Sequence, residues 1–131
     1  MSFLLDTNVC VAFLNGRDVG IRDKLLALDP ETACLCSVVK GELFYGARNS
    51  QHVDANLRRL RHFLEPFSSL PFDDDAAEHY GTLRAQLRRE GRLIGPNDLM
   101  IAAIALASDA TLVSRDQSEF HRIPGLRVVT W

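Results

Sequence analysis

The stretch Phe3-Leu4-Leu5-Asp6-Thr7-Asn8 decides the predicted fold, because a short apolar run ends abruptly in an acid, a hydroxyl and an amide. Consecutive apolar residues are typical of a strand buried on both faces, as in a parallel sheet. In open α/β sheets, ligands bind beyond the carboxyl ends of the strands. Asp6 is therefore the first candidate for a functional residue, although Asp6 or Thr7 would equally serve as the cap of a following helix.

Segments typical of strands and helices alternate along the rest of the chain. Further strands are expected over residues 32–37, 110–114 and 126–130, with a weaker one at 69–72. Helices are expected over residues 9–14, 18–28, 38–48, 53–64 and 73–91, and Gly95-Pro96-Asn97-Asp98 introduces an almost wholly apolar helix over 99–107. We expect Ser37 to be an N-cap. Alternation with short connections favours an α/β fold in which helices flank a parallel sheet.

Length and composition indicate one globular domain that spans residues 1–131. The chain has 131 residues, of which 47% are hydrophobic, enough to bury one core but too few for a second domain. No apolar run approaches the ~20 residues needed to span a bilayer. We therefore expect a cytoplasmic protein without a membrane partner.

The distribution of charged residues does not decide whether the protein binds nucleic acid. The net charge of −2 does not indicate nucleic-acid binding by the molecule as a whole. Arginines nevertheless gather in two groups, Arg58, Arg59 and Arg61, and Arg84, Arg88, Arg89 and Arg92. Guanidinium groups match phosphate geometry well, but arginine on an exposed helix face also needs no ligand.

The cysteines, Cys10, Cys34 and Cys36, are expected to be reduced and buried.

Four acids occupy comparable places in this pattern. Asp6 follows the first strand, Glu42 lies in the helix after the second strand, Asp98 begins the apolar helix, and Asp116 follows a later strand. A parallel sheet can bring all four to one edge, where their like charges repel strongly. A hard divalent cation would offset that repulsion, and oxygen ligands without His or Cys favour Mg²⁺ or Mn²⁺ over zinc.

The motifs around these acids have a recognisable order. They are Leu4-Leu5-Asp6-Thr7-Asn8, Gly41-Glu42-Leu43-Phe44-Tyr45-Gly46-Ala47, Ile94-Gly95-Pro96-Asn97-Asp98-Leu99-Met100-Ile101-Ala102-Ala103, and Leu112-Val113-Ser114-Arg115-Asp116 followed by Glu119-Phe120. Across nearly the whole chain, this series resembles the motifs of PIN-domain nucleases, and most of all the VapC toxins of bacterial toxin–antitoxin pairs. The Gly-Pro-Asn-Asp helix start is its most specific element.

This resemblance implies a three-layer α/β/α PIN-like domain with a central, mainly parallel sheet. It implies a metal-binding and catalytic site of Asp6, Glu42, Asp98 and Asp116, supported by Thr7 or Asn8 and by Ser114. The implied activity is that of an Mg²⁺-dependent endoribonuclease, with Mn²⁺ as a substitute. The implied partners are a second copy in a homodimer, an antitoxin whose tail occupies the active-site groove, and an RNA substrate for which initiator tRNA is a candidate.

Two departures from the family pattern stand out. Ile104 occupies a position where similar sequences often carry His, which we interpret as a packing variation. Ser114-Arg115-Asp116 replaces the more usual Thr-Asn-Asp or Thr-Asn-Asn. Two roles stay open for Arg115, contact with an RNA phosphate or bracing of Asp116.

Two alternatives to a toxin ribonuclease remain at this stage. One is a PIN-type nuclease with a role in RNA processing or on DNA. The other is a non-catalytic α/β binding module whose acids only cap helices, in which neutralising Asp98 would have little effect.

Overall fold

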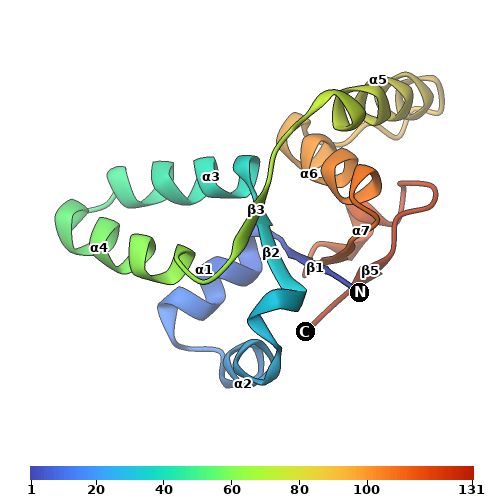
Figure 1. The fold of residues 1–131 in the computed structure, drawn as a ribbon. Coiled ribbons are helices and arrows are strands. Elements are labelled where there is room, and N and C mark those ends of the chain that lie inside the picture. The colour runs from blue at the N-terminus through green and yellow to red at the C-terminus, as the bar shows by residue number, and fades with distance from the viewer.

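Five short strands form one all-parallel sheet in the computed structural model, which describes residues 1–131 (Figure 1). The strands are β1 (Phe3–Leu5), β2 (Ala33–Cys36), β3 (Ser68–Leu70), β4 (Thr111–Val113) and β5 (Val128–Val129), in the spatial order β3-β2-β1-β4-β5. The chain adds β2 and β3 on one side of β1 and then returns to add β4 and β5 on the other. The order of the strands therefore reverses between β1 and β4, which is where α/β sheets open a ligand crevice.

Seven α-helices flank this sheet, and the expected α/β architecture is confirmed. They are α1 (Thr7–Asn15), α2 (Val19–Ala27), α3 (Ser37–Arg48), α4 (Val53–Leu64), α5 (Asp74–Arg89), α6 (Pro96–Ala107) and α7 (Gln117–Phe120), and a 3₁₀ turn covers Pro30–Thr32. In Figure 1, α1, α3 and α4 lie together on one side of the strands, and α5 and α6 pack against each other on the other.

Burial explains why consecutive apolar residues form these strands. Leu4 and Leu5 are fully buried, as is every residue of β2 and β4 to within a few per cent, because helices cover both faces of the sheet. Cys34 and Cys36 belong to this core as free thiols, and burial raises the pKa of Cys34 to about 11. The apolar helix α6 is buried nearly all round, as its composition predicts.

Helix caps set several element boundaries. The Asp18 and Asp73 carboxylates accept hydrogen bonds from the Ile21 and Ala76 backbone N–H groups, at 3.0 and 2.9 Å, and so begin α2 and α5. The prediction that Ser37 caps α3 is wrong, because the chain turns directly out of the buried strand β2 and Ser37 is already the first helical residue.

The remaining differences concern the shortest elements. Strand β3 ends at Leu70, before Pro71, which has no N–H to donate to a neighbouring strand. Helix α7 was not expected from the sequence, since its four residues are too few to show a helical period. No helix combines the length and the apolar composition needed to cross a membrane.

A substitution at Ile104 tests its role in core packing, because its side chain on α6 is 0% exposed. Ile104→Ala should lower the free energy of unfolding by about 2–5 kcal/mol through lost burial and a residual cavity. Leu26→Ala is the control, since Leu26 is 69% exposed on α2 and its truncation should change that free energy by only about 0.5 kcal/mol. Urea unfolding of the two variants measures the difference, and equal losses would contradict the assigned packing role of Ile104.

Candidate functional site

The candidate site lies at the carboxyl ends of β1 and β4, where the strand order reverses. Asp6 directly follows β1, and Ser114 and Asp116 follow β4. The Asp6 backbone N–H donates to the Val113 carbonyl at 2.9 Å, so the two strand ends lie side by side. The topology therefore places the acids from two distant parts of the sequence in one crevice.

Asp6 is held by two hydrogen bonds that use both oxygens of its carboxylate. Oδ1 accepts from the Thr7 backbone N–H at 2.8 Å, which caps α1, and Oδ2 accepts from the Ser114 hydroxyl at 2.7 Å. Burial raises the pKa of Asp6, the bonds from Ser114 and Thr7 lower it, and the charge of Asp116 raises it further. Asp6 therefore caps α1 with one carboxylate oxygen and contacts Ser114 with the other, so the two interpretations of Asp6 are compatible.

Ser114 also positions the next acid. Its side chain is fully buried, and its hydroxyl oxygen accepts a hydrogen bond from the Asp116 backbone N–H at 3.0 Å while donating to Asp6. One hydroxyl therefore fixes the relative positions of Asp6 and the turn that carries Asp116. The Asp116 carboxylate in turn accepts a hydrogen bond from the Ser118 hydroxyl at 3.1 Å.

Glu42 reaches the crevice from the second turn of α3. The Thr7 hydroxyl donates to Glu42 Oε1 at 3.0 Å, so Thr7 links the start of α1 to this acid. Asn8, the alternative supporting residue, is exposed and makes no side-chain hydrogen bond. Of the two, it is Thr7 that contacts an acid of the cluster.

Asp98 is an acid whose ionisation is disfavoured first by burial and then by its acidic neighbours. It is the third residue of α6 and is half-buried. Burial raises its pKa to about 7, together with a hydrogen bond shared with Glu119 and the negative charges of Asp6, Glu119 and Glu42. Each of these acids is therefore close enough to Asp98 to disfavour its ionisation.

Glu119 belongs to this cluster, although sequence reasoning assigned it no role. It lies on α7, three residues after Asp116, a spacing that puts two side chains on the same side of one helical turn. One carboxylate oxygen each from Asp98, Asp116 and Glu119 lie within 4.8 Å of one another. The spacing of Asp116 and Glu119 was the available signal, but it becomes informative only once α7 is known to be helical.

The donor set suits a hard divalent cation. The acidic cluster (Asp6, Glu42, Asp98, Asp116 and Glu119) offers only carboxylate oxygens, and none of its members forms an ion pair with an arginine, a lysine or a histidine. Carboxylates held together without a cationic partner repel one another, and a bound cation relieves that repulsion. We conclude that Asp98, Asp116 and Glu119 fit a metal ion, with Asp6 and Glu42 adjacent.

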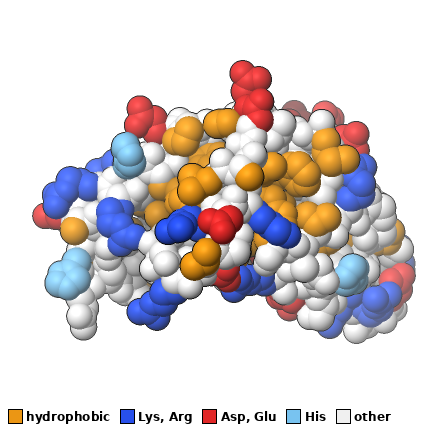
Figure 2. All heavy atoms as spheres, turned by 90° about the horizontal axis from the view of Figure 1, so that it is seen from below, with side chains coloured by type: hydrophobic (Ala, Val, Ile, Leu, Met, Phe, Trp, Pro, Cys, Tyr) orange, Lys and Arg blue, Asp and Glu red, His pale blue; other side chains and the backbone are white.

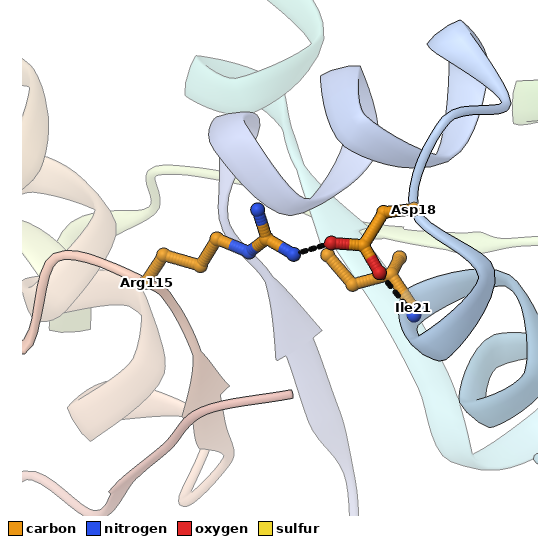
Figure 3. Close-up of polar contacts among 3 residues, drawn as sticks. All are labelled: Asp18, Ile21 and Arg115. Carbon is orange, nitrogen blue, oxygen red and sulfur yellow. Dashed lines mark hydrogen bonds and ion pairs between the residues drawn. The ribbon is translucent and has the colours of Figure 1, made fainter.

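Arg115 lies between Ser114 and Asp116 in the sequence, but its side chain points away from the cluster. Its guanidinium forms an ion pair with the Asp18 carboxylate, whose other oxygen caps α2 through the Ile21 N–H (Figure 3). The side-chain contact that the structure gives Arg115 is thus with Asp18 and not with Asp116. This brace joins the loop after β4 to the start of α2.

A groove opens beside Glu42, between α3 and the start of α6. This Tyr45 groove has a volume of about 590 Å³, and its lining includes Thr7, Gly41, Glu42, Tyr45, Asn97 and Met100. A second, apolar groove is lined by Phe13 of α1, Leu26 of α2, Phe63 of α4 and Phe67, which lies between α4 and β3. Figure 2 shows hydrophobic side chains gathered across the lower face of the molecule.

Comparisons with known proteins find similar chains over the full length of this one. The model of the PIN domain family matches residues 3–126. The chain is 37% identical over 131 residues to the tRNA(fMet)-specific endonuclease VapC of Shigella flexneri, with 100% of this chain and 98% of that protein covered. It is 37% identical over 132 residues to Ribonuclease VapC2 of Rickettsia felis, with the same coverage.

A solved structure shares the whole fold. The crystal structure of VapBC2 from Rickettsia felis, bound to a DNA fragment from their promoter, contains a chain that superimposes with a TM-score of 0.94 at 36% identity. The match covers 100% of this chain and 99% of that one.

The raised pKa of Asp98 predicts how stability depends on pH in the absence of metal. Between the unfolded value near 3.9 and the folded value of about 7, the native state binds more protons than the unfolded state. The free energy of unfolding should therefore fall as pH rises through this range. Asp98→Asn removes the titration, so its stability relative to wild type should increase from about pH 4 to about pH 7.

Thermal melts in EDTA at several pH values measure this difference. A gap between the two proteins that is the same at every pH would contradict the prediction. Mg²⁺ provides the control, because an ion that binds only the native state stabilises it by about 2.7 kcal/mol at a hundredfold excess over its dissociation constant. We expect wild type to gain most of this and Asp98→Asn to gain little.

Proposed function

We propose that the acidic cluster of this chain cleaves RNA with a bound Mg²⁺ ion. The premise is that the chain belongs to the PIN-domain family and, within it, to the VapC ribonucleases of toxin–antitoxin pairs. The observation that carries this proposal is the meeting of five carboxylates, without a cationic partner, at the point where the strand order reverses. The catalytic residues proposed are Asp6, Glu42, Asp98 and Asp116, with Glu119 added from the structure.

Asp98, Asp116 and Glu119 are the metal ligands that the geometry supports best, because their oxygens lie closest together. A bound divalent cation lowers the pKa of its coordinated water and offsets charge on phosphoryl oxygens. Asp98 would hold such an ion in its ionised form, since a carboxylate coordinates after losing its proton. Glu42 would either contact the ion directly or orient a water molecule beside it.

The supporting residues hold these acids in place before the ion arrives. The Ser114 hydroxyl fixes Asp6, and the Thr7 hydroxyl turns Glu42 toward the crevice. Such outer hydrogen bonds orient ligands and typically change metal affinity or activity by ~10–100-fold when lost. Burial of Asp6 and Ser114 also keeps water away from the base of the site.

The substrate and the partners follow from the relatives. The Shigella flexneri protein is named for tRNA(fMet), and we propose initiator tRNA as the substrate here because that protein matches the full length of this chain. The solved relative is a VapBC complex, which supports an antitoxin partner for this chain. A homodimer of single-domain chains, residues 1–131, acting on RNA in the cytoplasm, completes the proposal.

Cleavage assays test the activity. Purified protein freed of antitoxin should cleave RNA with Mg²⁺ or Mn²⁺ and stop in EDTA. Asp98→Asn and Asp6→Asn should each lower the cleavage rate, because each removes a charge from the metal site. The reduction should exceed the ~10–100-fold that is typical when a hydrogen bond to a metal ligand is lost. Asp23→Asn is the control, since Asp23 is exposed on α2. Cleavage that survives EDTA would exclude this mechanism.

Arg115 is the proposed contact for an RNA phosphate. Its ion pair with Asp18 uses one terminal nitrogen, so the other N–H groups of the half-exposed guanidinium are open to a second contact, and Arg115 directly precedes Asp116 in the chain. Arg115→Ala should weaken RNA binding and reduce the slope of log affinity against log salt by about 0.7, the value for one contact on a single strand.

A second arginine provides the matched control for this measurement. Arg127 is also half-exposed in an ion pair, with Asp109, but it lies near Thr111, at the amino end of β4. Arg127→Ala should leave the salt slope unchanged. An unchanged slope in Arg115→Ala would assign that residue to the brace on α2 alone.

A further inference from the structure

Tyr45 is an exposed aromatic residue one turn beyond Glu42. Its side chain is 70% exposed, and its ring belongs to none of the aromatic pairs that stabilise the fold. Its hydroxyl makes no hydrogen bond within the chain. Because residues three apart share a helix face, the ring lies on the same side of α3 as an acid of the cluster.

The groove beside Tyr45 is continuous with the candidate active site. Thr7 and Glu42, which hydrogen-bond to each other at 3.0 Å, belong to both. The volume of about 590 Å³ falls within the ~300–1,000 Å³ range of small-ligand sites. A ligand in the groove would therefore lie directly beside the carboxylates.

The chemistry of the lining indicates which part of an RNA fits. No lysine or arginine lines the groove, and its one charged residue is Glu42, so the lining does not favour a phosphate. The Tyr45 ring offers a flat face, Met100 offers an apolar contact, and the Asn97 amide offers a donor and an acceptor for a base edge. These features match a nucleobase.

Gly41 leaves the wall of the groove without a side chain at this point of α3. It lies in the interior of α3, where glycine disfavours the helix relative to alanine, and a Cβ added there would meet no atom within 4 Å. The chain itself therefore gives no steric reason for the missing side chain. Gly46 and Gly81 have the same open surroundings, but of these three glycines Gly41 is the one that lines the groove, where the missing side chain would let a ligand approach the helix closely.

We propose that the Tyr45 groove binds an unpaired nucleotide of the RNA next to the cleaved phosphodiester, with its base stacked on the Tyr45 ring. This inference rests on the proposed ribonuclease function and adds a recognition site to it. Proteins commonly bind unpaired RNA by stacking its bases on aromatic side chains, and stacking accepts any base. The groove then orients the strand, and sequence preference comes from other contacts.

Tyr45→Ala and Tyr45→Phe test the stacking. A fluorescein-labelled, unstructured RNA oligonucleotide serves as the ligand, and its anisotropy is measured with Asp98→Asn protein, which is expected to bind without cleaving. Tyr45→Ala should bind roughly 5- to 150-fold more weakly, the ratio equivalent to ~1–3 kcal/mol per stacked base. Tyr45→Phe should bind like the parent. Leu26→Ala, an equally exposed apolar truncation on α2, should also bind like the parent.

Cleavage kinetics separate this inference from the proposed function. In protein with Asp98 intact, Tyr45→Ala should raise KM while kcat changes little. Wild type that cleaves no RNA would overturn the ribonuclease proposal itself. If wild type cleaves RNA and Tyr45→Ala binds RNA as the parent does, only the proposal that the groove binds a nucleotide is overturned. The same conclusion holds if Tyr45→Ala loses antitoxin binding but keeps RNA binding. Equal losses in the Ala and Phe variants would exclude stacking.

Gly41→Ala provides a test with opposite effects on stability and binding. Alanine should raise the melting temperature, because it favours the helix, and the added methyl group should raise KM for RNA. Gly81→Ala on α5 is the matched control, since a Cβ there also meets no atom within 4 Å. It should raise the melting temperature without changing KM. An unchanged KM in Gly41→Ala would contradict close approach of RNA to α3.

Discussion

The hydrogen bond from the Ser114 hydroxyl to the Asp6 carboxylate is the contact on which the arrangement of the site depends. It joins residues 108 positions apart in the sequence and is fully buried. A buried carboxylate is costly unless its oxygens have partners, and here Thr7 and Ser114 supply one each. Because Ser114 also accepts from the Asp116 N–H, the same contact sets the distance between the strand end that carries Asp6 and the turn that carries Asp116.

The site combines stabilising and destabilising interactions in the same residues. Asp6 caps α1, which favours folding, while burial and the charge of Asp116 raise its pKa and oppose its ionisation. Asp98 heads the buried helix α6 and at the same time faces the charges of Glu42 and Glu119. The fold tolerates this repulsion because β1, β4 and α6 are packed in the core, so the acids cannot move apart.

An acidic crevice has to accept a polyanion if the chain cleaves RNA. The net charge of −2 gives no general attraction, so local features have to supply the contacts. A divalent metal ion would neutralise part of the negative charge at the cluster itself. Two features offer such contacts: Arg115, which is held by Asp18, and the uncharged part of the Tyr45 groove beside Glu42. The two features differ in chemistry, one suited to phosphate and the other to a base.

The sequence by itself determined the layered fold and the location of the acids. Consecutive apolar residues such as Phe3-Leu4-Leu5 are typical of a strand that is covered on both faces, and the polar residue that follows lies where the strand ends. Local patterns of this kind depend on a few neighbouring residues and can therefore be read from the chain.

Only the tertiary structure decided which side chains meet. Glu119 joins the cluster because α7 turns it toward Asp98, and four residues carry no helical period. Arg115 pairs with Asp18 and not with Asp116, and that depends on where α2 begins relative to β4. Tyr45 is exposed because α6 leaves a groove beside α3. Contacts across such distances are set by the packing of helices on the sheet, for which the spacing of residues along the chain gives no direct signal.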